Sequence, residues 1–360
     1  MKRFLIHTIL FVIFLVISFE IIFRTVLPAS EIPEVFRDQE YMVLKYDTSS
    51  VRDGLFTSGR MTQQQSKWHV NNDGWISDID YLPKDERQKP LIAVIGDSYI
   101  EGLFVEWKDH LASGLKEGLN FEYDVYAYGI SGAVMSHYIL VSEYLEAKFQ
   151  PDIVIYFINQ KDILTSIERY ASRGRNMQLR CVDETFFEIP PSVQSRSKLK
   201  QLLLYPAITR YFFLNANLNL MNAGLVDAAT NVSTLTEAEE LEKEHLVNEA
   251  AVYIVKRMKN RLPNSRLIFV VDGNREALYD SPDEMPERID SSVPLERACR
   301  LEGCDFLDLN ETFYNDYQEH HRLFNFKHNY HWDEYGNALI AKTLLPIISE
   351  PEVPDTLSNL

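Results

Sequence analysis

The hydrophobic pattern divides the chain into two unlike parts. Residues Phe4 to Phe23 are apolar almost without interruption, whereas beyond about residue 88 short apolar runs alternate with longer amphipathic stretches. Twenty helical residues rise about 30 Å, which is the thickness of a bilayer's hydrocarbon core. The pattern therefore predicts a membrane anchor over residues 1–24 and a folded domain over residues 88–350.

Within the second part, strand-like and helix-like segments follow one another in turn. This alternation is typical of a parallel sheet that is covered by helices on both faces. The expected strands are 91–95, 123–128, 153–158, 267–271 and 305–309, and the expected helices are 111–119, 134–149, 237–261, 293–299 and 334–348. We therefore predict an α/β fold of three layers, with a doubly wound, five-stranded parallel sheet of the flavodoxin-like type.

Three segments fall outside this alternation of strands and helices. Residues 163–235 interrupt it, and we expect a packed helical insertion there, with a lid over the substrate or a helix lying on a membrane as alternatives. Residues 25–87 are expected to form a linker and an N-terminal extension, in which Asn72-Asp73-Gly74 predicts a tight turn. The tail 351–360 is expected to be flexible.

The apolar segment is interpreted as a retained, single-pass anchor rather than a cleaved signal peptide. A signal peptide has a shorter apolar core followed by small residues at a cleavage site, and Leu27-Pro28-Ala29-Ser30 fits such a site poorly. Lys2 and Arg3 precede the run, so the short N-terminal tail is expected on the cytoplasmic side. The domain would then lie on the periplasmic or extracytoplasmic side.

Charge and cysteine content narrow the class of protein. The 360 residues carry a formal net charge of -17, and because the first 30 residues are net positive, the whole acidic excess lies beyond them. An acidic surface repels nucleic acid, so we expect no nucleic-acid partner. Cys181, Cys299 and Cys304 are too few for a disulfide framework. Three buried thiols are the favoured interpretation, with a bridge between Cys299 and Cys304 as the alternative.

Polar residues that suit acyl transfer follow four of the expected strands. Ser98 comes directly after the first strand, Gly129 ends the second, Asn159 follows the third, and His331 lies between the fifth strand and the last helix. In an open parallel sheet, the carboxyl ends of the strands meet at one edge. A hydroxyl nucleophile, an imidazole base and donors aimed at a developing oxyanion are the parts that ester chemistry needs.

These segments resemble the four sequence blocks of the SGNH (GDSL) hydrolase family, and in particular its membrane-anchored bacterial type. The matching blocks are GDSYIEG at 96–102, VYAYGISGA at 125–133, FINQKD at 157–162 and HNYHWDEYGNALIA at 328–341. The resemblance implies that Ser98 is the nucleophile and His331 the general base. It further implies that the N–H groups of Ser98 and Gly129 and the Asn159 amide hold the oxyanion. It implies no cofactor and no metal, and a cluster of four histidines at 320–331 lacks the spacing of a metal site.

The chain departs from the family pattern at the residue that should orient the base. The last family block is normally D-x-x-H, whereas His328 stands at the aspartate position here. The imidazole of His331 would then be held by a backbone carbonyl, in a Ser-His dyad, or by Asp333 or Asp308. In the third block, Phe157 and Gln160 replace the family's glycine and aspartate.

The resemblance implies a serine esterase or deacylase acting on ester groups, in particular O-acetyl groups of a cell-surface glycan. A glycan O-acyltransferase using the same residues is the first alternative, and it would need a membrane partner that supplies the acyl group. A non-catalytic glycan-binding or assembly protein is the second alternative, and His328 is the residue that favours it.

Overall fold

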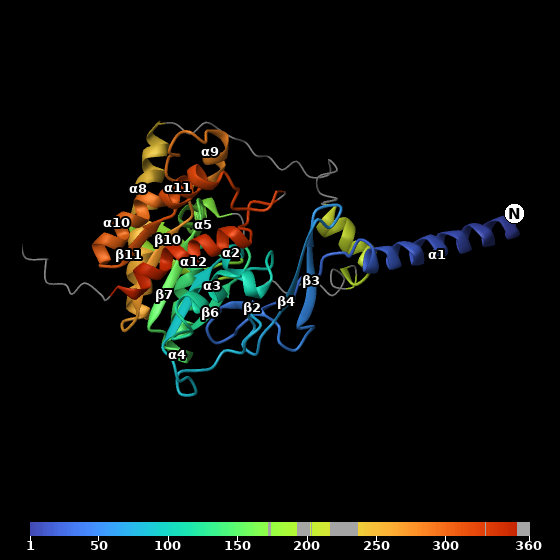
Figure 1. Ribbon diagram of the computed structural model, residues 1–360, viewed down its shortest axis with the longest axis horizontal. Coiled ribbons are helices and arrows are strands. Elements are labelled where there is room, and N and C mark those ends of the chain that lie inside the picture. The colour runs from blue at the N-terminus through green and yellow to red at the C-terminus, as the bar shows by residue number, and fades with distance from the viewer. Residues whose placement is uncertain (172–173, 193–201, 203, 217–236, 328, 351–360) are drawn as a thin grey trace, which may run out of the picture.

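The computed structural model describes residues 1–171, 174–192, 202, 204–216, 237–327 and 329–350. Its centre is a parallel sheet in the order β11-β10-β7-β5-β6, flanked by helices on both faces (Figure 1). In chain order this sheet reads 5-4-3-1-2, so the strand order reverses at β5. The predicted doubly wound α/β fold with five parallel strands is confirmed. Its strands are β5 (Leu91–Gly96), β6 (Asp124–Gly129), β7 (Ile153–Ile158), β10 (Arg266–Val271) and β11 (Asp305–Asp308).

The other elements surround this sheet. The remaining strands are β1 (Val35–Arg37), β2 (Leu44–Tyr46), β3 (Asp53–Ser58), β4 (Gln64–His69), β8 (Gln178–Val182) and β9 (Thr185–Ile189). The α-helices are α1 (Lys2–Thr25), α2 (Ser98–Glu101), α3 (Leu111–Gly118), α4 (Tyr138–Lys148), α5 (Asp162–Ser166), α7 (Ala207–Arg210), α8 (Glu237–Arg261), α9 (Arg275–Asp280), α10 (Ser292–Glu302), α11 (Asn310–His320) and α12 (Glu334–Ser349). Short 3₁₀ turns are η1 (Trp107–Asp109), η2 (Met135–His137) and η3 (Glu168–Tyr170), and η4 (Tyr211–Asn215) is a π-helical turn.

The sheet is buried on both sides because successive side chains of a strand point to opposite faces. Along β5, Ala93 and Ile95 join one hydrophobic core, whereas Ile92 and Val94 join the other. The first core is closed by α4, α8 and α10, and the second by α3, α9, α11 and α12. This explains why these strands are apolar throughout rather than alternating in polarity.

The N-terminal extension is an integral part of the domain. Trp68, Trp75 and Tyr81 are buried in the same core as the first face of the sheet. The Tyr81 hydroxyl accepts the Ala127 N–H at 2.8 Å and donates to the Ala127 carbonyl oxygen at 2.9 Å. The exposed edge of β6 is thereby covered, which protects it from pairing with another chain.

The insertion is only partly helical, so the prediction for 163–235 is wrong over part of its length. Strands β8 and β9 form an antiparallel hairpin whose turn residues Asp183 and Glu184 have φ of 48° and 60°. The β-branched and aromatic residues of these two short segments favour strands over helix. Residues 193–201, 203 and 217–236 of the insertion lie outside the described residues, as does the tail 351–360.

The cysteines are free thiols. Cys299 is buried, whereas Cys181 and Cys304 are half-buried, so the prediction of three buried thiols holds for only one of them.

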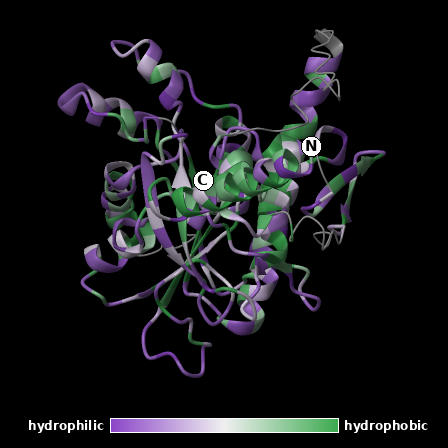
Figure 2. Ribbon diagram, turned by 90° about the vertical axis from the view of Figure 1, so that its right-hand side faces the viewer, coloured by the Kyte–Doolittle hydropathy of each residue, from purple (hydrophilic) through white to green (hydrophobic). Residues whose placement is uncertain are grey.

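Helix α1 is long and apolar enough to cross a membrane, and it extends away from the domain (Figure 1). In Figure 2 this helix points toward the viewer, and its ribbon is coloured as predominantly hydrophobic. Its side chains are almost all exposed, apart from those near its C-terminal end. An exposed apolar helix of this length fits a membrane anchor or a signal sequence.

Candidate active site

Ser98 stands at the carboxyl end of the sheet, where the strand order reverses. Strand β5 ends at Gly96, and α2 begins at Ser98. Asp97 caps this helix because its Oδ1 accepts the Tyr99 N–H at 3.0 Å. The neighbours of β5 are β6 and β7, so the crevice where doubly wound sheets bind ligands opens beside Ser98.

The structure brings the predicted nucleophile and the predicted base together. Ser98 Oγ lies 2.7 Å from His331 Nε2, although the two residues are 233 positions apart in the chain. A hydroxyl at this distance from an imidazole nitrogen can give up its proton as it attacks a carbonyl carbon.

Asn329 orients the imidazole. Its Oδ1 lies 2.5 Å from His331 Nδ1 and also accepts the backbone N–H of His331 at 3.0 Å. Because the backbone N–H can only donate, the shared atom must be the carboxamide oxygen. Nδ1 of His331 therefore carries the ring proton, and the lone pair of Nε2 faces Ser98. This is the tautomer that a general base needs.

The three expected ways of holding His331 are therefore corrected. Asp333 caps α12 by accepting the Gly336 N–H at 2.9 Å, and Asp308 accepts from Arg288 Nε at 2.7 Å. Within the part of the chain that the structure describes, neither carboxylate is bonded to the imidazole, and Nδ1 is held by Asn329 rather than by a backbone carbonyl. His328, the residue that motivated these alternatives, lies outside the described residues. The signal that could have found Asn329 is its place two residues before the histidine, since a short polar side chain there can fold back onto the ring.

The surroundings of His331 keep it neutral. Phe104 stacks on its ring at 3.8 Å between centroids, and Tyr99 lies against it at 4.6 Å. Burial, followed by the positive charge of nearby Arg275, lowers the pKa of His331 to about 3. Both causes disfavour the imidazolium form. The base is consequently unprotonated at neutral pH, as proton abstraction requires.

Arg275, which the sequence pattern did not single out, connects the nucleophile to the loop that carries the base. Its guanidinium donates to the Tyr330 carbonyl oxygen at 2.9 Å and to the Tyr99 hydroxyl at 3.1 Å. It also pairs with Asp272 at 2.7 Å, and Asp272 in turn accepts from Trp332 Nε1 at 3.2 Å. The planar, multidentate guanidinium suits this role. The loop around His331 is thus held to the segment that contains Ser98.

Replacing Arg275 by methionine should raise the pKa of His331, because a positive charge is lost and the carboxylate of Asp272 is left unpaired. We expect the acid limb of the kcat/KM profile for ester cleavage to move upward by about one pH unit or more. Activity would then be lost as pH falls through a higher value than in the unmodified protein. The matched control is Arg288→Met, which breaks an ion pair with Asp308 that does not involve His331. Superimposable profiles for the unmodified chain and Arg275→Met would contradict this assignment.

Two of the three predicted oxyanion donors are arranged around Asp97. Asn159 Nδ2 donates to Asp97 Oδ2 at 2.7 Å, and the Asn159 N–H donates to Asp162 at 2.8 Å. A carboxamide has two N–H donors, so fixing one by Asp97 leaves the other for a ligand. The N–H of Ser98 has no hydrogen-bond partner among the described residues. Burial raises the pKa of Asp97 to about 6 and also raises the pKa of Asp162.

The third predicted donor, Gly129, has a packing reason to be glycine. It is buried at the end of β6, and a Cβ there would lie 2.0 Å from the Glu101 backbone nitrogen. Close packing of α2 on β6 therefore explains this glycine. Three residues further on, Gly132 is exposed, has φ of +74° and has open space where a Cβ would be.

The loop that contains Gly132 is held by a buried carboxylate. Glu101 accepts the Ser131 N–H at 2.8 Å as well as the hydroxyls of Ser131 and Tyr46. Tyr46 belongs to β2, so the N-terminal extension contributes to fixing this loop.

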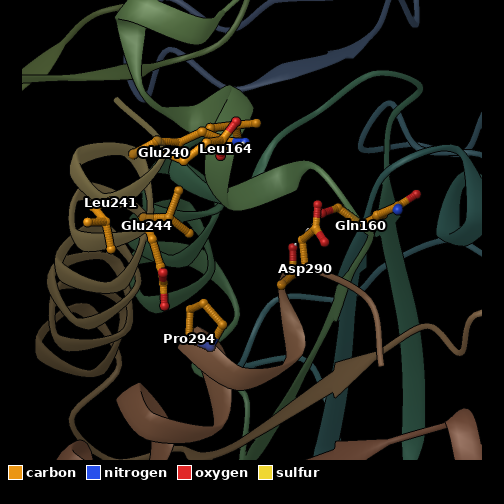
Figure 3. A pocket seen from close by; sticks show the side chains of 10 residues that line it. Gln160, Leu164, Glu240, Leu241, Glu244, Asp290 and Pro294 are labelled. Atoms are coloured by element: carbon orange, nitrogen blue, oxygen red, sulfur yellow. Dashed lines mark hydrogen bonds and ion pairs between the residues drawn. The ribbon is translucent and has the colours of Figure 1, made fainter. Parts of the chain in front are cut away.

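A cavity of about 440 Å³ is lined by Asp97 and Tyr99, on either side of Ser98 in the chain, and by Tyr330, which precedes His331; most of its lining side chains are polar or charged. The residues that line it are Asp97, Tyr99, Asn159, Gln160, Lys161, Asp162, Asp272, Gly273, Asn274, Arg275, Glu276, Ile289 and Tyr330. A second cavity, of about 400 Å³, lies between α5, α8 and α10 (Figure 3). Its lining contains no chain neighbour of Ser98 or His331, whereas that of the first cavity contains three, so the first cavity is the candidate substrate site.

No family model and no curated protein match this chain. Among solved structures, it is similar to a member of the lipolytic protein G-D-S-L family from Veillonella parvula, at 12% identity and a TM-score of 0.39, over 72% of this chain and 99% of that one. It is also similar to an acetyl xylan esterase from Butyrivibrio proteoclasticus, at 13% identity and a TM-score of 0.37, over 77% of this chain and 66% of that one. A GDSL-like lipase from Parabacteroides merdae is 16% identical, with a TM-score of 0.39, over 73% of this chain and 98% of that one.

Proposed function

We propose that this protein is a serine esterase or deacylase. The observation that supports the proposal is the line of contacts from Ser98 Oγ through His331 to Asn329 Oδ1, with distances of 2.7 Å and 2.5 Å. In such an arrangement the serine gives its proton to one ring nitrogen of the histidine, while the other ring nitrogen is already held by the asparagine. A degenerate, non-catalytic scaffold would have no reason to keep this alignment.

The proposed reaction has two halves. Ser98 Oγ attacks the carbonyl carbon of the ester while its proton passes to His331 Nε2. The tetrahedral intermediate then expels the alcohol, which takes that proton and leaves an acyl group on Ser98. In the second half, water gives a proton to Nε2 and attacks the acyl carbon. The bond between the acyl carbon and Ser98 Oγ then breaks, Oγ takes the proton back from Nε2, and the carboxylic acid is released.

Hydrogen-bond donors around Ser98 would stabilise the negative charge of the intermediate. The Ser98 N–H and the second Asn159 N–H are two of them. The loop after β6 supplies the third, and within it exposed Gly132 is a better candidate than buried Gly129. Removal of one such donor typically costs about 3–4 kcal/mol of transition-state stabilisation.

We further propose that the ester is a small acyl group, such as acetyl, on a glycan. The cavity next to Ser98 supports this, because Gln160, Lys161 and Asn274 line it and can bond to sugar hydroxyls. An apolar acyl-chain tunnel would instead be lined by aliphatic and aromatic side chains. We also propose that α1 anchors the protein in the membrane and that the domain lies on the extracytoplasmic side, where a cell-surface glycan would be within reach.

The full-length chain in detergent should release acetate from p-nitrophenyl acetate and from an acetylated oligosaccharide. Acetate release in both assays should stop when the protein is first treated with a fluorophosphonate, which modifies activated serines. Mass spectrometry of an added unmodified oligosaccharide separates the two reaction types, because only an acyltransferase would make the acceptor heavier. A preparation that releases no acetate from either substrate would contradict the esterase proposal.

A further inference from the structure

The last turns of α1 are bonded to the insertion. The Glu20 carboxylate accepts the N–H groups of Ala207 and Ile208 at 3.0 and 3.1 Å, and it pairs with Arg24 at 2.6 Å. The Phe23 ring stacks on Tyr211 with 4.0 Å between centroids. A carboxylate in an apolar helix is costly unless it is hydrogen-bonded and paired. The insertion therefore satisfies the one acidic group of the apolar segment.

These contacts fix the level at which the insertion lies along α1. Glu20 is five residues before the helix end at Thr25, which corresponds to about 8 Å along the helix axis. Helix α7 and turn η4 thus lie beside the last turns of the apolar run. When α1 crosses a bilayer, this is the level where hydrocarbon meets the lipid headgroups.

Apolar side chains are exposed at this level. In the insertion, Tyr205 is 75% exposed, Phe212 40% and Phe213 37%. The tip of the β3–β4 hairpin joins them, since the Tyr211 hydroxyl donates to the Arg60 carbonyl oxygen and neighbouring Met61 is 63% exposed. Aromatic side chains are enriched at the membrane–water interface because their rings suit the boundary between hydrocarbon and headgroups.

We propose that Tyr205, Phe212, Phe213 and Met61 form a membrane collar that inserts into the lipid interface around the end of α1. The proposal rests on α1 being the membrane anchor. The surface of the remaining domain is acidic, so it should stay away from anionic headgroups, while the apolar collar enters the bilayer. The collar would hold the catalytic domain in a fixed orientation above the membrane, rather than on a free tether.

The test places a fluorophore at the collar of the full-length chain in phosphatidylcholine nanodiscs. Cys181 and Cys304 are first replaced by serine, and Cys299 stays because it is buried. An environment-sensitive NBD label is then attached to Phe213→Cys or, separately, to Tyr205→Cys. The control for insertion is Phe14→Cys within α1. The control for a surface that faces water, away from the bilayer, is Leu301→Cys. Residue 301 belongs to α10, which lies at the opposite side of the domain (Figure 1).

Quenching by lipids that carry a doxyl group near the headgroup gives the result. We expect strong quenching at 205 and 213, quenching at 14 by lipids with a deeper doxyl group, and none at 301. Unquenched labels at both 205 and 213, with label 14 quenched, would overturn the collar. An unquenched label at 14 would overturn it as well, because α1 would then not be in the bilayer. Neither outcome bears on the proposed hydrolase activity, because quenching of the label does not depend on ester cleavage.

Discussion

Ser98→Ala should lower kcat for p-nitrophenyl acetate by about 10⁵–10⁶-fold, which corresponds to about 7–8 kcal/mol in the activation barrier. The hydroxyl that lies 2.7 Å from His331 Nε2 is the group that would form the acyl intermediate, and alanine offers no atom that can replace it. Binding of substrate should change little, because the backbone N–H of residue 98 and the Asn159 amide remain in place.

The matched control for this variant is Ser49→Ala. Ser49 is exposed, and among the described residues its hydroxyl bonds to Asp47 alone, so it takes no part in the site. We expect the Ser49 variant to retain the activity of the unmodified chain. Thermal unfolding followed by circular dichroism shows whether either variant is folded. A folded Ser98→Ala variant with undiminished turnover would contradict the role of Ser98 as nucleophile.

The second large effect is expected at Asn329. Asn329→Ala removes the acceptor that keeps the proton on His331 Nδ1, so part of the imidazole population should adopt the wrong tautomer or rotate away from Ser98. We expect kcat to fall by about 10²–10⁴-fold, as is found where a catalytic triad loses its orienting group. Hydrolysis of p-nitrophenyl acetate at saturating substrate measures the loss.

Asn329→Asp separates this orienting role from mere packing. Aspartate keeps the oxygen that accepts from Nδ1 and adds a negative charge that stabilises the imidazolium, so activity should be retained or increased. The control is Asn315→Ala on the exposed face of α11, for which we expect no change. Equal, large losses for Asn329→Ala and Asn329→Asp would point to a packing role and contradict the proposal.

The sheet could be predicted from the sequence because each of its buried strands is a short, continuous run of apolar residues. Buried parallel strands are apolar on both faces, so a run such as Ile153–Ile158 stands out from the helices around it. The placement of Ser98 and His331 at one edge then follows from the topology, since the carboxyl ends of parallel strands share an edge.

The residues that were missed act through contacts that sequence spacing does not encode. Arg275 reaches Tyr99 and Tyr330, which are 176 and 55 positions away in the chain. In the N-terminal extension, no periodicity reveals that Tyr81 packs on the edge of β6. The family pattern places the orienting residue at position 328, whereas the side chain that bonds to Nδ1 of His331 is that of Asn329.

The central claim is that Ser98 is activated by His331, and fluorophosphonate labelling of the folded full-length chain tests it most directly. Peptide mapping by mass spectrometry identifies the modified residue. The account predicts a single adduct on Ser98 in the unmodified chain, and labelling that is slower by orders of magnitude in a folded His331→Ala variant. An intact chain that remains unlabelled at Ser98, or that labels equally fast without the imidazole, would contradict it.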